Sequence, residues 1–270
     1  MKIAFIGGGN MASALIGGLI KRGAAPADFH VVDPGNEARE RVGQQFGIAT
    51  TAAIDPTLAG FDAIVLAVKP QVLKDVAQAL QPVLSKQLVI SIAAGIRASD
   101  LSRWLDGYST IVRTMPNTPA LIGMGVTGLA ALPGVSDDAK ALASKVMEAV
   151  GNTVWFDDET MIDAVTGISG SGPAYVFYFI EAMQEAARQL GMNEEQGRAL
   201  AVATFTGAAQ LAAQSGEPAS VLRERVTSKG GTTAAALASF DKDGVKAAIV
   251  RGALAADARA KEMGAELGKA

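Results

Sequence analysis

Residues 2–12 read KIAFIGGGNMA, an apolar run that enters a glycine-rich turn and continues into a helical pattern. Gly7 allows a tight turn, Gly9 lets the backbone approach a pyrophosphate, and the small Ala12 lets the helix pack closely against the strand. The N-terminus of that helix offers free N–H groups and a partial positive charge to the same anion. The stretch therefore predicts a strand, turn and helix that bind a dinucleotide. The alternative is an ordinary glycine-rich turn.

A second strand supports the dinucleotide interpretation. Residues 29–32, Phe-His-Val-Val, predict a strand that ends in an acid, Asp33. This carboxylate follows the glycine motif by about 20 residues, where a ribose-binding acid is expected. The motif is therefore in the context that a dinucleotide-binding unit requires.

Composition excludes several classes of function. The chain has 270 residues, a formal net charge of −3, no cysteine and one histidine, His30. The charge argues against a nucleic-acid surface and shows no sign of membrane attraction. The lack of cysteine excludes disulfides and thiolate zinc sites, and a single histidine disfavours a metal cluster or a Ser-His-Asp triad. No apolar run approaches the roughly 18 residues of a membrane helix. We expect a soluble, cytoplasmic protein without metal, nucleic acid or membrane partners.

Strand and helix patterns alternate over residues 1–157. The expected strands are Ile3–Ile6, Phe29–Val32, Ala63–Ala67, Leu88–Ile92, Thr110–Arg113, Val126–Ala131 and Thr153–Phe156. The expected helices are Met11–Lys21, Asn36–Gln45, Val72–Leu80, Ala98–Trp104 and Ser136–Val150. The early strands are continuously apolar, as parallel strands covered on both faces are. The alternation predicts an α/β fold, a Rossmann-type doubly wound sheet that forms a dinucleotide-binding domain over residues 1–157.

Residues 158–270 are expected to form an all-α domain. Its expected helices are Asp158–Val165, Pro173–Leu190, Glu194–Gln214, Pro218–Val226, Thr232–Phe240 and Val245–Glu262. Residues 201–209, AVATFTGAA, have too little polar surface for a solvated helix, and a helix that is apolar nearly all round is buried. We expect this helix to be covered by a second copy of the chain, which predicts a homo-oligomer. The alternative is packing against the first domain.

Turns that follow the expected strands complete a candidate coenzyme site. In open α/β sheets, ligands bind beyond the carboxyl ends of the strands, so these turns should line one crevice. Two prolines fix the backbone on either side of Asn117, which favours a functional loop. The candidate coenzyme-binding residues are Ile6, Gly7, Gly8, Gly9, Asn10, Met11, Asp33, Asn36, Ala67, Val68, Lys69, Pro70, Ile92, Ala93, Ala94 and Asn117.

Two small-residue turns open helices in the second half of the chain. Residues 169–175 read SGSGPAY and residues 227–233 read TSKGGTT. Each presents free N–H groups and hydroxyls at a helix N-terminus, which suits an anion such as a carboxylate. Two purely structural caps remain the alternative, because serine and threonine are common N-caps.

These motifs, in this order over nearly the whole chain, resemble those of the pyrroline-5-carboxylate reductase family. The most specific are Ser169–Tyr175 and the Ser228-x-Gly230-Gly231-x-Thr233 turn. The resemblance implies an N-terminal dinucleotide domain and a C-terminal helical dimerisation and substrate domain over 158–270. It also implies a homodimer that often assembles further, commonly into a decamer, with the active site at the subunit interface.

The resemblance implies hydride transfer from NAD(P)H to the C=N carbon of L-1-pyrroline-5-carboxylate, which gives L-proline. It places the substrate carboxylate on the N–H groups around Gly230, Gly231 and Thr232, with Ser228 nearby and Ser171 as a further substrate contact. Thr233 is the expected catalytic residue, with its hydroxyl on the ring nitrogen. Such a reaction needs no strong nucleophile, because positioning and charge stabilisation supply most of the catalysis. His30 is therefore interpreted as structural or nucleotide-adjacent.

The chain departs from the family pattern at Asp33, where the family often has a neutral or basic residue and commonly prefers NADPH. A carboxylate there hydrogen-bonds the ribose of NADH and repels a 2′-phosphate. Asn36 and Arg39 are candidates for holding that phosphate if Asp33 turns away. Lys229 also stands where the family often has proline. The coenzyme is therefore expected to be NADP(H) or NAD(H), without a choice between them.

Two other functions are compatible with part of the pattern. A β-hydroxyacid dehydrogenase shares the two-domain plan but needs a lysine on the helix that begins near Pro173, and no lysine occurs there before Leu190. A nucleotide sensor without turnover would keep residues 7–12 but would not need the Ser228–Thr233 turn.

Overall fold

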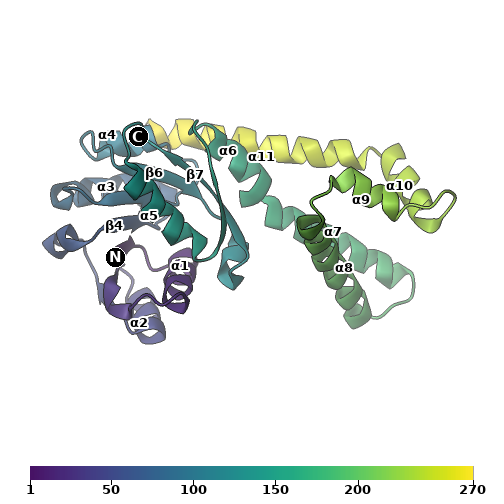
Figure 1. Ribbon diagram of the computed structural model, residues 1–270, viewed down its shortest axis with the longest axis horizontal. Helices are drawn as coiled ribbons and strands as arrows, with labels where there is room; N and C mark the ends of the chain where they lie inside the picture. Colours follow the sequence, from purple (N-terminus) through teal and green to yellow (C-terminus); the bar gives the residue numbers. More distant parts are fainter. Residues whose placement is uncertain (270) are drawn as a thin grey trace. The chain divides into compact units, whose positions relative to one another are not determined.

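The computed structural model describes residues 1–269, which form two compact units. The first unit is Met1–Ser171 together with the C-terminal stretch from Leu254, and the second is Gly172–Ala253. Figure 1 shows the chain coloured along its sequence.

The first unit is built on an eight-stranded sheet with the order β3-β2-β1-β4-β5-β6-β7-β8. Neighbouring strands are parallel except β6 and β7, which are antiparallel. The strands are β1 Ile3–Ile6, β2 Phe29–Val32, β3 Ala49–Thr51, β4 Ala63–Leu66, β5 Leu88–Ser91, β6 Ile111–Met115, β7 Gly125–Ala131 and β8 Gly151–Trp155. The strand order reverses between β1 and β4, which makes their carboxyl ends the topological switch point of a doubly wound sheet. The predicted fold class is confirmed.

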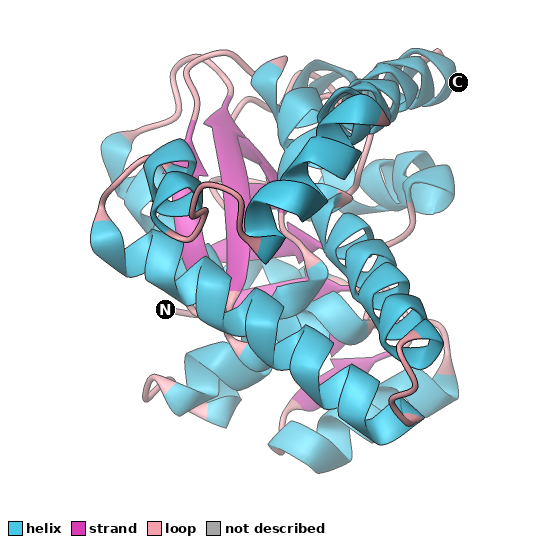
Figure 2. Ribbon diagram, turned by 90° about the vertical axis from the view of Figure 1, so that its right-hand side faces the viewer, coloured by secondary structure: helices cyan, strands magenta, loops and turns pink. Residues whose placement is uncertain are grey.

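Helices cover both faces of this sheet (Figure 2). The helices of the first unit are α1 Asn10–Lys21, α2 Asn36–Phe46, α3 Leu73–Leu80, α4 Ala98–Trp104, α5 Asp137–Glu148 and α6 Met161–Val165, with the later part of α11 Val245–Gly268. Because side chains alternate along a strand, Phe5 packs with α1, α2 and α5, whereas Ile6 packs with α3 and α4. The sheet is therefore buried on both sides, as its continuously apolar strands require.

Short turns of helix connect these elements. They are η1 Pro26–Asp28, η2 Pro56–Gly60, η3 Pro70–Val72, η4 Gln81–Val83, η5 Thr118–Ile122 and the π-helix η6 Thr166–Gly170. Two of them matter for the site: η5 follows the carboxyl end of β6, and η6 joins α6 to α7. π-helical turns are rare and are frequent at functional sites.

The second unit is helical, with α7 Gly172–Gln189, α8 Glu194–Ser215, α9 Ala219–Arg225, α10 Thr232–Lys242 and the first part of α11. The Asn193 cap of α8 that the sequence predicts is present as a capping box with Gln196. Helices α7 and α8 pack together, and the ring centroids of Phe179 and Phe205 are 6.3 Å apart.

Much of the apolar surface of the second unit is not covered by its own chain. Helix α8 is buried only at Gly197 and Ala201, although its sequence predicts a covered helix. Large apolar side chains are exposed in this unit, on its helices and at Leu190 just after α7, and they include Phe177, Tyr178, Leu200, Leu211, Phe240 and Val250. Exposed apolar surface on this scale is typical of protein–protein contact. It supports the expected oligomer.

The compact units do not coincide with the expected domain ranges of 1–157 and 158–270. Residues 158–171 and the chain from Leu254 belong to the first unit. One reason is the close approach of α11, because a Cβ on Gly264 would lie 2.7 Å from the carbonyl oxygen of Gly95. A second reason is an ion-pair cluster that ties α6 to the sheet.

That cluster is centred on Arg113 of β6, which is 1% exposed. Its Nη2 donates to Asp163 of α6 at 2.6 Å and its Nη1 to Glu159 at 3.2 Å. Glu159 also accepts the backbone N–H of Ala98, the first residue of α4, at 2.5 Å. The cluster therefore joins β6, α6 and α4. Removing Asp163 leaves the buried Arg113 with only the longer ion pair to Glu159, and loss of a buried partner is strongly destabilising.

We predict that Asp163→Asn lowers the free energy of unfolding of the first unit by about 3 kcal/mol, because Arg113 stays buried. Both tryptophans, Trp104 and Trp155, lie in this unit, so tryptophan fluorescence during urea unfolding measures it alone. Lys140→Gln is the control, since it breaks an exposed pair with Asp137, and its midpoint should match wild type. Equal midpoints for all three proteins would contradict the prediction.

His30 lies on β2 and has partners inside the sheet. Its Nε2 is 2.9 Å from the hydroxyl of Thr51, and its ring centroid is 5.9 Å from that of Phe61. Burial lowers the pKa of His30 below its usual 6.5, and the nearby Asp55 carboxylate opposes this only in part. The neutral imidazole is thus favoured in the folded chain.

This lowered pKa predicts that stability falls as the pH drops below 6.5. The unfolded chain takes up a proton there first, and the loss continues until the folded pKa is reached. Because the sequence has no other histidine, His30→Gln should flatten the pH dependence of the urea midpoint between about pH 7.5 and 5.5. An unchanged slope in the variant would show that His30 is not its source.

Candidate coenzyme and substrate site

The glycine turn after β1 is fixed by a close backbone approach. Gly7 has φ +103°, and a Cβ there would lie 2.5 Å from the carbonyl oxygen of Ala67. Its N–H donates to Val32 at 2.8 Å, and the N–H of Ala67 donates to Ile6 at 2.8 Å. The ends of β1, β2 and β4 are therefore held together at the switch point. Only glycine combines this φ with this approach.

Helix α1 begins beside that turn without a side-chain cap. Its N-cap is Gly9, in an extended conformation, and no atom lies within 4 Å of where a Cβ on Gly9 would be. The open space lets a ligand approach the backbone, and the first-turn N–H groups suit a phosphate. This is the arrangement that the glycine motif predicts.

Both backbone groups of Gly8 are held by side chains of the β2–α2 region. Its N–H donates to Asp33 Oδ2 at 2.8 Å, and its carbonyl accepts Arg41 Nη2 at 2.6 Å. The other carboxylate oxygen of Asp33 accepts the N–H of Gly35 at 2.8 Å. Asp33 therefore points into the glycine turn and its own loop.

The loop that follows Asp33 is braced by Arg39. Its Nη1 donates to the carbonyls of Asp33 at 2.7 Å and Pro34 at 2.9 Å, and its Nη2 donates to Asn36 Oδ1 at 3.0 Å. Asn36 in turn donates to Glu40 at 2.6 Å. Arg39 and Asn36 are thus neighbours beside the end of β2.

The expected turns after β4 and β5 lie at the same edge of the sheet. Lys69 precedes η3, which begins at Pro70. The N–H of Ile92 donates to Leu66 at 3.2 Å, and the carbonyl of Ser91 accepts the Thr114 hydroxyl at 3.0 Å. Segments Ala67–Pro70 and Ile92–Ala94 are therefore brought together with the glycine turn.

Asn117 follows β6, and its side chain makes hydrogen bonds to backbone groups of the protein. Its Nδ2 donates to the carbonyl of Ser169 at 3.1 Å, and its Oδ1 accepts the N–H of Val126 at 3.0 Å. The side chain is 8% exposed. The structure thus links the predicted coenzyme residue Asn117 to the turn that carries Ser171.

The turn at residues 228–233 lies in the second unit. Gly230 has φ +73°, and a Cβ on Gly231 would lie 2.4 Å from the Ser228 hydroxyl. Gly231 is the N-cap of α10, and no side chain caps this helix. Ser228, Gly230 and Thr232 are exposed, and Thr233 is half-buried. The turn therefore leaves N–H groups and hydroxyls accessible at the start of α10.

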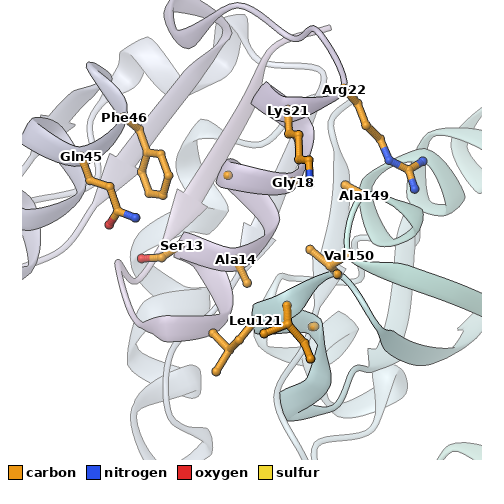
Figure 3. Close-up of a pocket in the computed structure, with 14 residues that line it drawn as sticks. Ser13, Ala14, Gly18, Lys21, Arg22, Gln45, Phe46, Leu121, Ala149 and Val150 are labelled. Carbon is orange, nitrogen blue, oxygen red and sulfur yellow. The ribbon is translucent and has the colours of Figure 1, made fainter. Parts of the chain in front are cut away.

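A cavity of about 670 Å³ lies along α1, and none of the predicted coenzyme residues lines it (Figure 3). Its lining includes Gly18, Phe46 and Leu121. The candidate site is therefore defined by the strand ends and helix starts rather than by this cavity.

Two contacts of the site escape prediction from the sequence. Arg41 holds the glycine turn, but its position on α2 resembles that of the neighbouring Arg39, so no signal separates their roles. The partner of Asn117 lies 52 residues away along the chain. Within residues 1–269, no group of three or more His, Asp or Glu side chains is placed to hold a metal, and no helix is long and apolar enough to cross a membrane.

Comparison with known proteins agrees with these features. A family model described as pyrroline-5-carboxylate reductase dimerisation matches residues 159–263, and one described as NADP oxidoreductase coenzyme F420-dependent matches residues 2–95. The pyrroline-5-carboxylate reductase of Pseudomonas aeruginosa is 45% identical, with 99% of this chain and 98% of the relative covered. That of Haemophilus influenzae is 43% identical, with 97% of each covered.

Solved structures give the same result for the fold. A pyrroline-5-carboxylate reductase from Coxiella burnetii superposes with a TM-score of 0.90 at 39% identity, covering 97% of this chain and 98% of that one. The Plasmodium falciparum enzyme, solved with NADP bound, gives 0.86 at 30% identity, covering 98% of each chain. This chain belongs to the pyrroline-5-carboxylate reductase family.

Proposed function

We propose that this protein reduces L-1-pyrroline-5-carboxylate to L-proline, the last step of proline biosynthesis. The observation that carries the proposal is the glycine-capped start of α10, which leaves N–H groups and hydroxyls open beside Gly230 and Gly231. A helix start of this kind binds a carboxylate. Family membership over the whole chain supplies the substrate class.

The reaction needs a hydride donor and a placed imine. NAD(P)H, when bound, supplies the hydride, which is added to the C=N carbon while the ring nitrogen carries the proton. The uncapped start of α1 and the open space beside Gly9 fit its pyrophosphate. The sixteen candidate coenzyme residues given above, from Ile6 to Asn117, are proposed to form this site.

The chain's own residues bind and orient the imine. The N–H groups of Gly230, Gly231 and Thr232 are proposed to hold the carboxylate, with Ser228 and Ser171 as further contacts. The Thr233 hydroxyl is proposed to bond the ring nitrogen. Holding a protonated imine in a fixed orientation and stabilising its charge supplies most of the catalysis.

We predict that Thr233→Ala lowers kcat/KM for the imine by roughly 10- to 100-fold, because the ring nitrogen loses its partner. Thr233→Ser keeps the hydroxyl and should restore much of the activity. Coenzyme affinity, measured by fluorescence titration, should change little in either variant. Unchanged turnover in Thr233→Ala would remove Thr233 from the mechanism and favour a nucleotide sensor.

The coenzyme is proposed to be NADPH. Each carboxylate oxygen of Asp33 already accepts a backbone N–H, from Gly8 and from Gly35. Both oxygens of Asp33 are therefore engaged by backbone N–H groups of the glycine turn and of its own loop, which favours the NADPH alternative. Arg39 and Asn36 lie side by side in the first turn of α2 and supply donors for a 2′-phosphate.

We predict that NADPH gives a higher kcat/KM than NADH, and that Arg39→Ala raises KM for NADPH about tenfold while the NADH value changes little. Lys86→Ala is the control, since it removes an exposed cation that precedes β5, at the amino end of that strand rather than at the carboxyl ends where the coenzyme is proposed to bind. Equal losses for both coenzymes in Arg39→Ala would mean that Arg39 only braces the loop.

The protein forms homo-oligomers through its helical dimerisation domain. A decamer, an active site shared between subunits and a cytoplasmic location are proposals, and the last is supported by the absence of cysteine from the sequence. The range 158–270 is likewise proposed as the functional dimerisation and substrate domain, supported by the family match at 159–263.

A β-hydroxyacid dehydrogenase is disfavoured because α7 has no lysine.

A further inference from the structure

We propose that Asn117 is a positioning residue for substrate binding. Through its bond to Ser169 it sets the place of the turn that carries Ser171 relative to the carboxyl end of β6. This inference rests on the proposed reductase function. It assigns the Asn117 side chain to the substrate turn and leaves the backbone of Asn117 to the proposed coenzyme site.

The hydrogen bonds of Asn117 join three segments that are distant in sequence. Nδ2 donates to the carbonyl of Ser169 in η6 at 3.1 Å, and Oδ1 accepts the N–H of Val126 in β7 at 3.0 Å. The residue itself is the extended N-cap of η5. Because the amide supplies one donor to η6 and one acceptor to β7, both of its ends are needed.

The residues on either side of Asn117 also fix the place of its hydrogen bond to Ser169. Pro116 and Pro119 restrict the backbone on both sides of Asn117. Two residues before Asn117, Met115 lies against Gly170, where an added Cβ would be 2.6 Å from Cε of Met115. The β6–η5 segment is therefore a surface on which residues 169–170 rest.

The segment held in this way is a π-helical turn. η6 spans Thr166–Gly170, and the N–H of Ser171 donates to the carbonyl of Thr166, five residues earlier, at 2.8 Å. A π-turn is less favourable than a continued α-helix and persists where its surroundings hold it. Asn117 supplies a tertiary hydrogen bond to this turn, two residues before Ser171.

Asn117→Asp removes one of the two hydrogen bonds of the side chain and keeps the other. The aspartate keeps an acceptor for Val126 but has no donor for Ser169, and its charge repels that carbonyl. We expect KM for L-1-pyrroline-5-carboxylate to rise about tenfold. The dissociation constant for NADPH should stay within twofold. Asn152→Asp is the matched control, because it makes the same change on an exposed position of β8 and should behave as wild type.

Hydrogen exchange at the Ser171 amide measures the stability of η6 directly, without an activity assay. In Asn117→Asp, exchange at this amide should be at least roughly tenfold faster than in wild type, because η6 opens more readily. Asn117→Ala gives a second route to the same effect if Asn117→Asp folds poorly, since it also removes the donor to Ser169 and introduces no charge.

A double-mutant cycle with Ser171→Ala completes the test. If Asn117 acts through the turn, Asn117→Asp should cost little further activity once the Ser171 hydroxyl is gone. Additive losses, an unchanged Ser171 exchange rate, or a loss confined to NADPH binding would overturn the proposal. A wild-type protein without imine turnover would reject the proposed function instead, and the exchange experiment would still decide whether Asn117 holds the turn.

Discussion

The site depends on one close backbone contact, between Gly7 and the carbonyl of Ala67. A β-carbon at residue 7 would lie 2.5 Å from that oxygen, and φ of +103° is open only to glycine. This contact brings the ends of β1 and β4 together where the strand order reverses. It also directs the chain into α1, so that the helix start faces the crevice in which an open α/β sheet binds its ligand.

The helices of the protein begin in different ways. Ser136 and Asn193 cap α5 and α8 with their side chains, which satisfies some of the first N–H groups within the chain. Helices α1, α2 and α10 begin instead at glycines, Gly9, Gly35 and Gly231, that have no side chain to offer, and two of them, α1 and α10, lie in the turns that the sequence analysis singles out for anions. These two helices are the ones proposed to meet the coenzyme pyrophosphate and the substrate carboxylate. The missing caps are therefore consistent with binding of anionic ligands.

Sequence patterns predict most of the sheet but not its edges. Strands β1 and β2 have the predicted bounds because they are short, apolar and wholly buried. The edge strand β3, Ala49–Thr51, consists of three residues that are exposed or partly exposed and have no apolar pattern, so the sequence predicts no strand there. Helix α11 runs six residues beyond the expected Glu262, to Gly268, because Gly264 packs against Gly95 and does not stop the helix. For the site, the sequence shows which residues follow strand ends, but not that Asp33 turns toward Gly8 or that Asn117 bonds Ser169.

The central claim is that these two open helix starts belong to one imine reductase. The most direct measurement is oxidation of NADPH by the purified wild-type protein, with and without L-1-pyrroline-5-carboxylate. The reaction is followed as the loss of NADPH absorbance. The account predicts oxidation that requires the imine and yields L-proline in equal amount. NADPH binding without any imine-dependent oxidation would contradict it.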